Sequence, residues 1–169
     1  MTVETSTLRE FTQRYMAAWN GRDASAMDAL VTDDIVWFDP ALPHPNRSRA
    51  DVRRFMEASW RAFPDLRFSE PDRPLLAEEG DQVAWAWRMR GTFTGGALEP
   101  PGFAPTGRPM DVTGIDQWEM RDGRIAHYRA FYDVNDLARQ LGIVPPAGSA
   151  GEKAMVALQR VQARFMNRR

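Results

Sequence analysis

Residues 110–121, MDVTGIDQWEMR, alternate apolar and polar side chains along most of their length. A period of two predicts a β-strand with one buried face. Asp116 falls on the apolar face, where burial of an unpartnered carboxylate raises its pKa and leaves it protonated near neutral pH. Two alternatives stay open: a register shifted by one residue would expose Asp116, or a buried arginine would pair with it. The predicted apolar face consists of Met110, Val112, Gly114, Asp116, Trp118 and Met120.

The same period continues on both sides of this strand. It predicts strands over residues 66–75, 82–94 and 124–132. Asp122-Gly123 favours a tight hairpin, so the last two strands should be antiparallel neighbours. Within 82–94, the residues on the apolar face are Val83, Trp85, Trp87, Met89 and Phe93.

Helical spacing dominates the N-terminal part of the chain. It predicts helices over 7–20, 23–31 and 52–63, and a strand over 35–39 that ends before Pro40. Tyr15 belongs to the buried stripe of the first helix, and Asp39 is the last residue of the strand. Helices followed by an antiparallel meander define an α+β fold class.

The C-terminal part is predicted to lie outside this domain. Residues 142–151 are rich in Pro and Gly, which is typical of a linker. We therefore expect a domain over 1–141, a linker over 142–151 and an extra C-terminal helix over 152–169. The helix carries an apolar stripe that needs a partner: Ala154, Leu158, Val161 and Phe165.

Composition excludes several kinds of chemistry. The 169 residues include no Cys and only two His, so a thiolate nucleophile and a thiolate metal site are excluded, and we expect no structural zinc site and no cofactor. A net charge of −1 argues against a nucleic-acid partner. No apolar run approaches the roughly 20 residues of a membrane helix, so we expect no membrane partner and a cytoplasmic location.

Four short motifs then point to a family. They are Gln13-Arg14-Tyr15, Asp33-Asp34 followed by Asp39-Pro40, Gly114-Ile115-Asp116, and Asp122-Gly123-Arg124 leading into Tyr128-Arg129-Ala130-Phe131. In order and spacing, residues 8–133 resemble ketosteroid isomerases and the wider nuclear transport factor two-like superfamily. The resemblance implies a cone-shaped, curved antiparallel sheet wrapped around the N-terminal helices.

The resemblance also implies catalytic roles. Asp39 would be the general base, and Tyr15 and a protonated Asp116 would donate hydrogen bonds to the oxyanion. Ketosteroid isomerase is itself the established case of a carboxylic acid kept neutral by an apolar site. The alternatives are that Tyr15 is an ordinary core tyrosine and that Asp39 is a turn residue before Pro40.

Two other segments resemble a different family of the same superfamily. The loop Pro105-Thr106-Gly107-Arg108-Pro109 and residues 136–142 are similar to SnoaL-like polyketide cyclases, which close a ring by an intramolecular aldol reaction. The leading hypothesis is a cofactor-independent, ketosteroid-isomerase-like enzyme that removes an α-proton and stabilises an enolate. The alternatives are a SnoaL-like cyclase, a limonene-type epoxide hydrolase, and a non-catalytic binding or dimerisation module.

The expected ligand is an apolar, steroid-like or polyketide-like small molecule, and the resemblance implies a homodimer. Aromatic and apolar side chains on the predicted inner faces are the candidate substrate contacts. They are Trp19, Phe55, Trp60, Trp85, Trp87, Trp118, Met120, Tyr128 and Tyr132.

Overall fold

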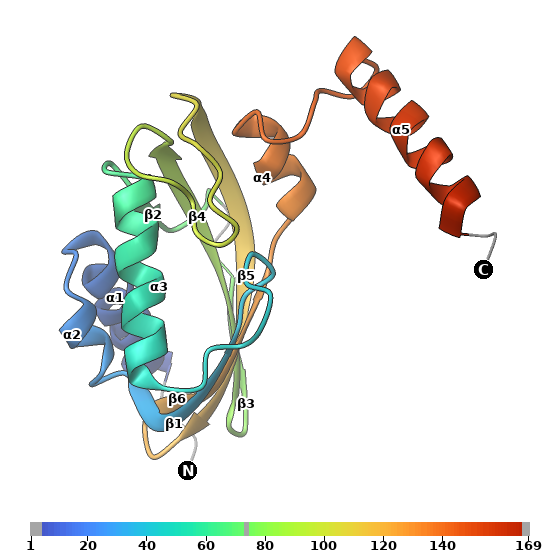
Figure 1. The fold of residues 1–169 in the computed structure, drawn as a ribbon. Coiled ribbons are helices and arrows are strands. Elements are labelled where there is room, and N and C mark those ends of the chain that lie inside the picture. The colour runs from blue at the N-terminus through green and yellow to red at the C-terminus, as the bar shows by residue number, and fades with distance from the viewer. Residues whose placement is uncertain (1–4, 73–74, 167–169) are drawn as a thin grey trace.

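The computed structural model describes residues 5–72 and 75–166. The chain begins with two helices, continues with a strand and a third helix, and then forms a run of strands followed by two further helices (Figure 1). In chain order the elements are α1 (Thr5–Asn20), α2 (Ala24–Met27), β1 (Val31–Phe38), α3 (Arg49–Ala62), β2 (Arg67–Ser69), β3 (Leu76–Glu79), β4 (Gln82–Thr92), β5 (Pro109–Arg121), β6 (Arg124–Phe131), α4 (Val134–Gln140) and α5 (Ala150–Met166).

The strands form one curved, six-stranded sheet in the order β1-β6-β5-β4-β2, and β3 pairs with another part of β4. All neighbours are antiparallel except β1 and β6, which run parallel. Asp122 and Gly123 both have positive φ, as the tight turn between β5 and β6 requires. This hairpin and the α+β fold class are therefore confirmed.

Helices α1 and α3 lie against one face of the sheet, which is the inner face (Figure 1). Residues of β5 alternate strictly between exposed and buried, and its buried set is the predicted apolar row as far as Trp118. The row packs against the buried stripe of α1, and Tyr15 of that stripe is 1% exposed. Burial of apolar surface between the helices and the inner face holds the two layers together.

The structure differs from the sequence prediction at several places. The second helix was expected over 23–31, but α2 ends at Met27 and β1 begins at Val31. The strand expected over 66–75 is too long, because β2 ends at Ser69 and residues 70–72 are not in a strand; residues 73–74 lie outside the described residues, and β3 begins at Leu76. Pro71 lies in the interruption, and proline cannot donate a hydrogen bond to a ladder. β1 is longer than expected, and residues 134–140, for which no helix was predicted, form α4.

Helix α5 stands apart from the rest of the chain on the side of the sheet opposite α1 and α3 (Figure 1). Its large apolar side chains are exposed, with Leu158 at 60% and Phe165 at 67%. The division into a domain, a linker and a terminal helix stays a prediction. Among the described residues, no helix is both long and apolar enough to span a membrane.

Candidate active site

A cavity of about 90 Å3 lies on the inner side of the sheet, between α1, α3, α4 and the strands. Its wall is mostly aromatic and aliphatic, and it contains one carboxylate, that of Asp39. The lining residues are Trp19, Asp39, Ala41, Phe55, Ser59, Phe63, Leu66, Phe68, Trp87, Met89, Leu98, Met110, Tyr128, Tyr132 and Leu137.

Asp39 directly follows the last residue of β1, the strand that pairs with β6, and its side chain lines the cavity. Its Oδ1 atom accepts hydrogen bonds from the Tyr132 hydroxyl (2.8 Å) and from the backbone N–H of Ala41 (2.9 Å). Asp39 thus makes the turn contact expected of a residue before Pro40 and also lines the cavity. Burial raises the pKa of the Asp39 carboxyl above its usual value, and the two hydrogen bonds lower it by less.

Asp116 is 1% exposed and lies in the middle of β5. Its Oδ1 atom accepts hydrogen bonds from Trp87 Nε1 (2.6 Å) and from the Tyr128 hydroxyl (2.9 Å). No arginine pairs with it among the described residues, and the register places it inside, so both alternatives to a buried carboxyl group are wrong. Burial raises the pKa of Asp116 to about 8, which leaves it mostly protonated at pH 7.

Gly114 allows Trp87 to reach Asp116. The two residues Trp87 and Gly114 face each other across β4 and β5. A Cβ atom at position 114 would lie 2.3 Å from the Trp87 indole, so only glycine leaves room for the ring to lie over β5. From this position the indole N–H meets the carboxyl group of the next inward-facing residue of β5.

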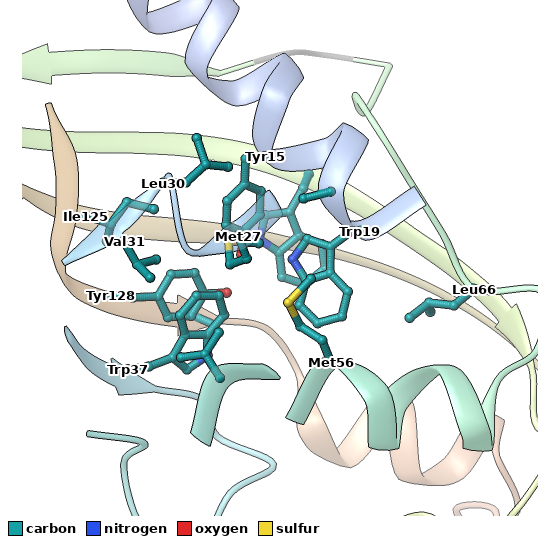
Figure 2. Close-up of a cluster of buried hydrophobic side chains, with 14 of the residues drawn as sticks. Tyr15, Trp19, Met27, Leu30, Val31, Trp37, Met56, Leu66, Ile125 and Tyr128 are labelled. Atoms are coloured by element: carbon teal, nitrogen blue, oxygen red, sulfur yellow. The ribbon is translucent and has the colours of Figure 1, made fainter. Parts of the chain in front are cut away.

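Tyr15 approaches the same cluster from α1. Figure 2 shows Tyr15, Tyr128 and Trp37 in one buried group, and Tyr128 stacks on Trp37 with ring centroids 3.6 Å apart. Tyr15 stacks near Trp37 as well, with ring centroids 6.3 Å apart, and the phenols of Tyr15 and Tyr128 are close enough for each to influence the pKa of the other. Burial and the proximity of Asp116 raise the pKa of both phenols, so both remain protonated.

The three predicted catalytic residues therefore divide into two groups. Asp39 lines the cavity, whereas Tyr15 and Asp116 do not. Asp116 is connected to the cavity wall through its hydrogen bonds with Tyr128 and Trp87, and Tyr15 lies in the buried group beside Tyr128 (Figure 2). Five of the nine predicted substrate contacts line the cavity: Trp19, Phe55, Trp87, Tyr128 and Tyr132. The other four lie elsewhere in or beside the core and do not line it: Trp60, Trp85, Trp118 and Met120.

Several lining residues were not found by sequence reasoning. Leu98 comes from the loop between β4 and β5, and Leu137 comes from α4. Neither segment has a periodic pattern that would place a side chain in a distant cavity. Phe68 of β2 is paired opposite Met89 of β4, which the sequence had placed on the apolar face. The alternation of Phe68 with polar neighbours was the available signal for its inward orientation.

No metal centre is formed by the described part of the chain. Among residues 5–72 and 75–166, no group of three or more His, Cys, Asp or Glu side chains is arranged to hold a metal ion. The ionisable groups that line the cavity are the carboxyl group of Asp39 and the phenols of Tyr128 and Tyr132, and Asp116 lies behind them.

Solved structures share this fold. TsrD from Streptomyces laurentii is 23% identical, with a TM-score of 0.71 over 83% of this chain and 98% of that one. AclR, a candidate hydroxylase from Streptomyces galilaeus, is 23% identical, with a TM-score of 0.69 over 96% of this chain and 98% of that one. IdmH, a candidate polyketide cyclase from Streptomyces antibioticus, is 27% identical, with a TM-score of 0.61 over 79% and 97% of the two chains.

A search among curated proteins found no match. The comparison with protein families gives a match over residues 9–141, which includes the whole sheet, the cavity and the residues behind it. The chain belongs to the SnoaL-like polyketide cyclase family.

Proposed function

We propose that the protein is a cofactor-independent cyclase that closes a ring in a polyketide-like carbonyl substrate by an intramolecular aldol reaction. The observation that carries the proposal is the placement of Asp39, a carboxylate held at one oxygen in the wall of an apolar cavity. Membership of the family favours this reaction over steroid isomerisation, although both begin with the same proton abstraction.

In the proposed reaction Asp39 removes a proton from the carbon next to a carbonyl group, and the electron pair of the C–H bond forms an enolate. The enolate carbon then attacks a second carbonyl carbon of the same molecule. A carbon–carbon bond forms, the π electrons of that carbonyl move to its oxygen, and the oxygen takes up the proton from Asp39. A raised pKa suits Asp39 to this exchange, because a base works best when its pKa approaches the working pH.

Tyr128 is the hydroxyl donor that faces the cavity in this proposal. In the structure the Tyr128 hydroxyl donates to Asp116 Oδ1. A protonated Asp116 can reverse this hydrogen bond and donate to the Tyr128 oxygen, which would free the Tyr128 O–H to point at the enolate oxygen. Asp116 and Tyr15 then act as positioning residues behind Tyr128. A fixed donor of this kind is typically worth about 2.7–4 kcal/mol of transition-state stabilisation.

The test is deuterium exchange into cyclohexanone in D2O, followed by NMR. Cyclohexanone is a compact ketone whose uncatalysed exchange is slow at neutral pH. We expect the wild type to accelerate exchange and Asp39→Asn to lose roughly 10²-fold or more of that acceleration, because the amide cannot accept the proton. Asp33→Asn, which alters an exposed carboxylate in β1, is the matched control.

Two results would contradict the proposal. One is exchange at the buffer rate in the presence of the wild type, which would favour a non-catalytic binding module. The other is equal acceleration by the wild type and Asp39→Asn, which would remove Asp39 from the role of base.

A further inference from the structure

Five aromatic residues that line the cavity contact one another in series and form an aromatic belt along its wall. Phe55 meets Trp19 edge to face with ring centroids 6.1 Å apart, and Trp19 meets Phe68 at 5.1 Å. Phe68 then meets Trp87 at 5.7 Å with the ring planes 68° apart, and Trp87 meets Tyr132 at 5.7 Å and 65°. All five line the cavity. Three of the four contacts are edge to face, with ring planes 65–86° apart, and the Trp19–Phe68 contact is tilted, with ring planes 41° apart.

The belt ends at a carboxylate. The hydroxyl of its last ring, Tyr132, donates to Asp39 Oδ1, so the aromatic belt and Asp39 enclose the same space. Asp39 is the only charged side chain among the described residues that line the cavity, and none of these residues is Lys, Arg or His. The electrostatic field in the cavity therefore favours a cation and disfavours an anion.

We propose that this cavity binds an alkylated ammonium group, with the positive charge enclosed by the aromatic belt of Phe55, Trp19, Phe68, Trp87 and Tyr132 and paired with Asp39. The negative faces of aromatic rings attract a cation, tryptophan most strongly, and quaternary ammonium groups are the ligands that aromatic cages bind best. The cavity of about 90 Å3 has room for about three water molecules. A group as compact as trimethylammonium fits a space of this size.

This proposal concerns binding and does not require Asp39 to abstract a proton. It would hold for a substrate that carries both an amine and a carbonyl group, and equally for an inhibitor or a non-substrate ligand. Its tests therefore measure binding, and none of them depends on turnover.

The first test compares three ligands of closely similar shape by isothermal titration calorimetry of the wild-type protein. Choline is a cation, 3,3-dimethylbutan-1-ol is its neutral isostere, and 3,3-dimethylbutanoate is an anion with the same branched end. We expect choline to bind about tenfold more tightly than the alcohol, because it adds the cation–π attraction and the ion pair to the same apolar contact. The anion should bind more weakly than the alcohol.

The second test locates the site with two substitutions and their controls. Asp39→Asn should remove most of the preference for choline over the alcohol while leaving the binding of the alcohol nearly unchanged. Phe68→Leu keeps apolar volume but removes a ring face. It should therefore weaken the binding of choline by a factor of about 2–30 and the binding of the alcohol by less. The controls are Asp33→Asn, on the exposed edge, and Phe103→Leu, a 41% exposed aromatic residue that does not line the cavity.

Each other outcome overturns the proposal. Equal binding of choline and the alcohol would show an apolar cavity without cation selectivity, and so would tighter binding of the alcohol. An absence of binding by choline would show that the cavity does not accept the ammonium group. An unchanged preference for choline in both Asp39→Asn and Phe68→Leu would show that choline binds somewhere else. These results leave proton exchange into cyclohexanone untouched, so the two proposals fail independently.

Discussion

Asp116 connects the buried side chains behind the cavity, because both Trp87 and Tyr128 are hydrogen bonded to it. Its carboxyl group is enclosed, and it is held by the indole N–H of Trp87 and the hydroxyl of Tyr128 rather than by a cation. A neutral acid is stable in such surroundings, and an ionised one is not. The free energy that keeps Asp116 protonated must therefore also appear in the pH dependence of folding.

We expect the stability of the wild type to fall as the pH rises from about 4 to about 8. In this range the unfolded chain has an ionised Asp116, whereas the folded protein retains the proton, so deprotonation favours the unfolded state. Each unit of pKa difference is worth about 1.4 kcal/mol. The asparagine of Asp116→Asn cannot ionise, so this variant should lack the part of the pH dependence of the unfolding free energy that Asp116 causes. Urea unfolding of both proteins at several pH values measures the difference.

The difference between the two proteins is the informative quantity. Burial also raises the pKa of Asp39, and its contribution is common to wild type and variant. A slope in Asp116→Asn equal to that of the wild type would mean that Asp116 is already ionised in the folded protein. It would then be unable to donate a hydrogen bond to Tyr128.

At the scale of elements, α4 closes one end of the cavity. Asp111 of β5 donates its backbone N–H to Gln140 Oε1, and Gln140 Nε2 donates to the Asp111 carbonyl. The side chain of Gln140 thus pairs with β5 as a backbone amide would, and it ties the end of α4 to the start of that strand. This attachment holds Leu137 in the cavity wall.

We predict that Gln140→Ala loosens α4 without unfolding the domain. The change removes two hydrogen bonds to the backbone of β5, and a typical bond of this kind contributes about 0.5–1.5 kcal/mol. Hydrogen exchange should therefore become faster in residues 134–141 and remain slow in the centre of β5. Mass spectrometry of peptic fragments reports both segments. Gln159→Ala, on the exposed helix α5, is the matched control. Unchanged exchange in 134–141 would show that packing alone holds α4.

At the scale of the whole molecule, α5 contributes little to the fold of a single chain. Its apolar stripe is exposed, and the outer face of the sheet also exposes apolar side chains, among them Ile115 and Phe131, which are opposite each other on β5 and β6. Exposed apolar surfaces of this extent are typical of contacts with other molecules. The expected homodimer remains a prediction, and these two surfaces are where it would be sought.

We predict that a chain ending at Val144 folds with the thermal stability of the full-length protein. Removal of an exposed helix takes away no core contact, so the midpoint of thermal unfolding should change by less than about 2 °C. Differential scanning calorimetry measures the midpoint, and light scattering at the same concentrations measures the oligomeric state. A lower midpoint together with a loss of dimer would show that α5 contacts a second copy. A lower midpoint in a chain that is a monomer throughout would show that α5 packs on its own domain.

The sequence by itself determined the features that depend on local pattern. The alternation in residues 110–121 placed Asp116 inside β5, and Asp122-Gly123 specified the hairpin, because side-chain period and turn chemistry act over a few residues. The end of β1 before Pro40 placed Asp39 at a strand terminus for the same reason. The motifs also indicated the superfamily, which the family match supports.

Only the tertiary structure decided which of these residues share a cavity. The parallel pairing of β1 with β6 brings Asp39 to Tyr132, residues that are 93 positions apart, and no local pattern encodes that contact. Trp87 can lie over β5 only because Gly114 on the next strand has no side chain. Trp87 and Tyr128, which both donate hydrogen bonds to Asp116, then lie between Asp116 and the cavity. These relations arise from the packing of distant segments, which depends on the volumes and shapes of all the side chains in the core together.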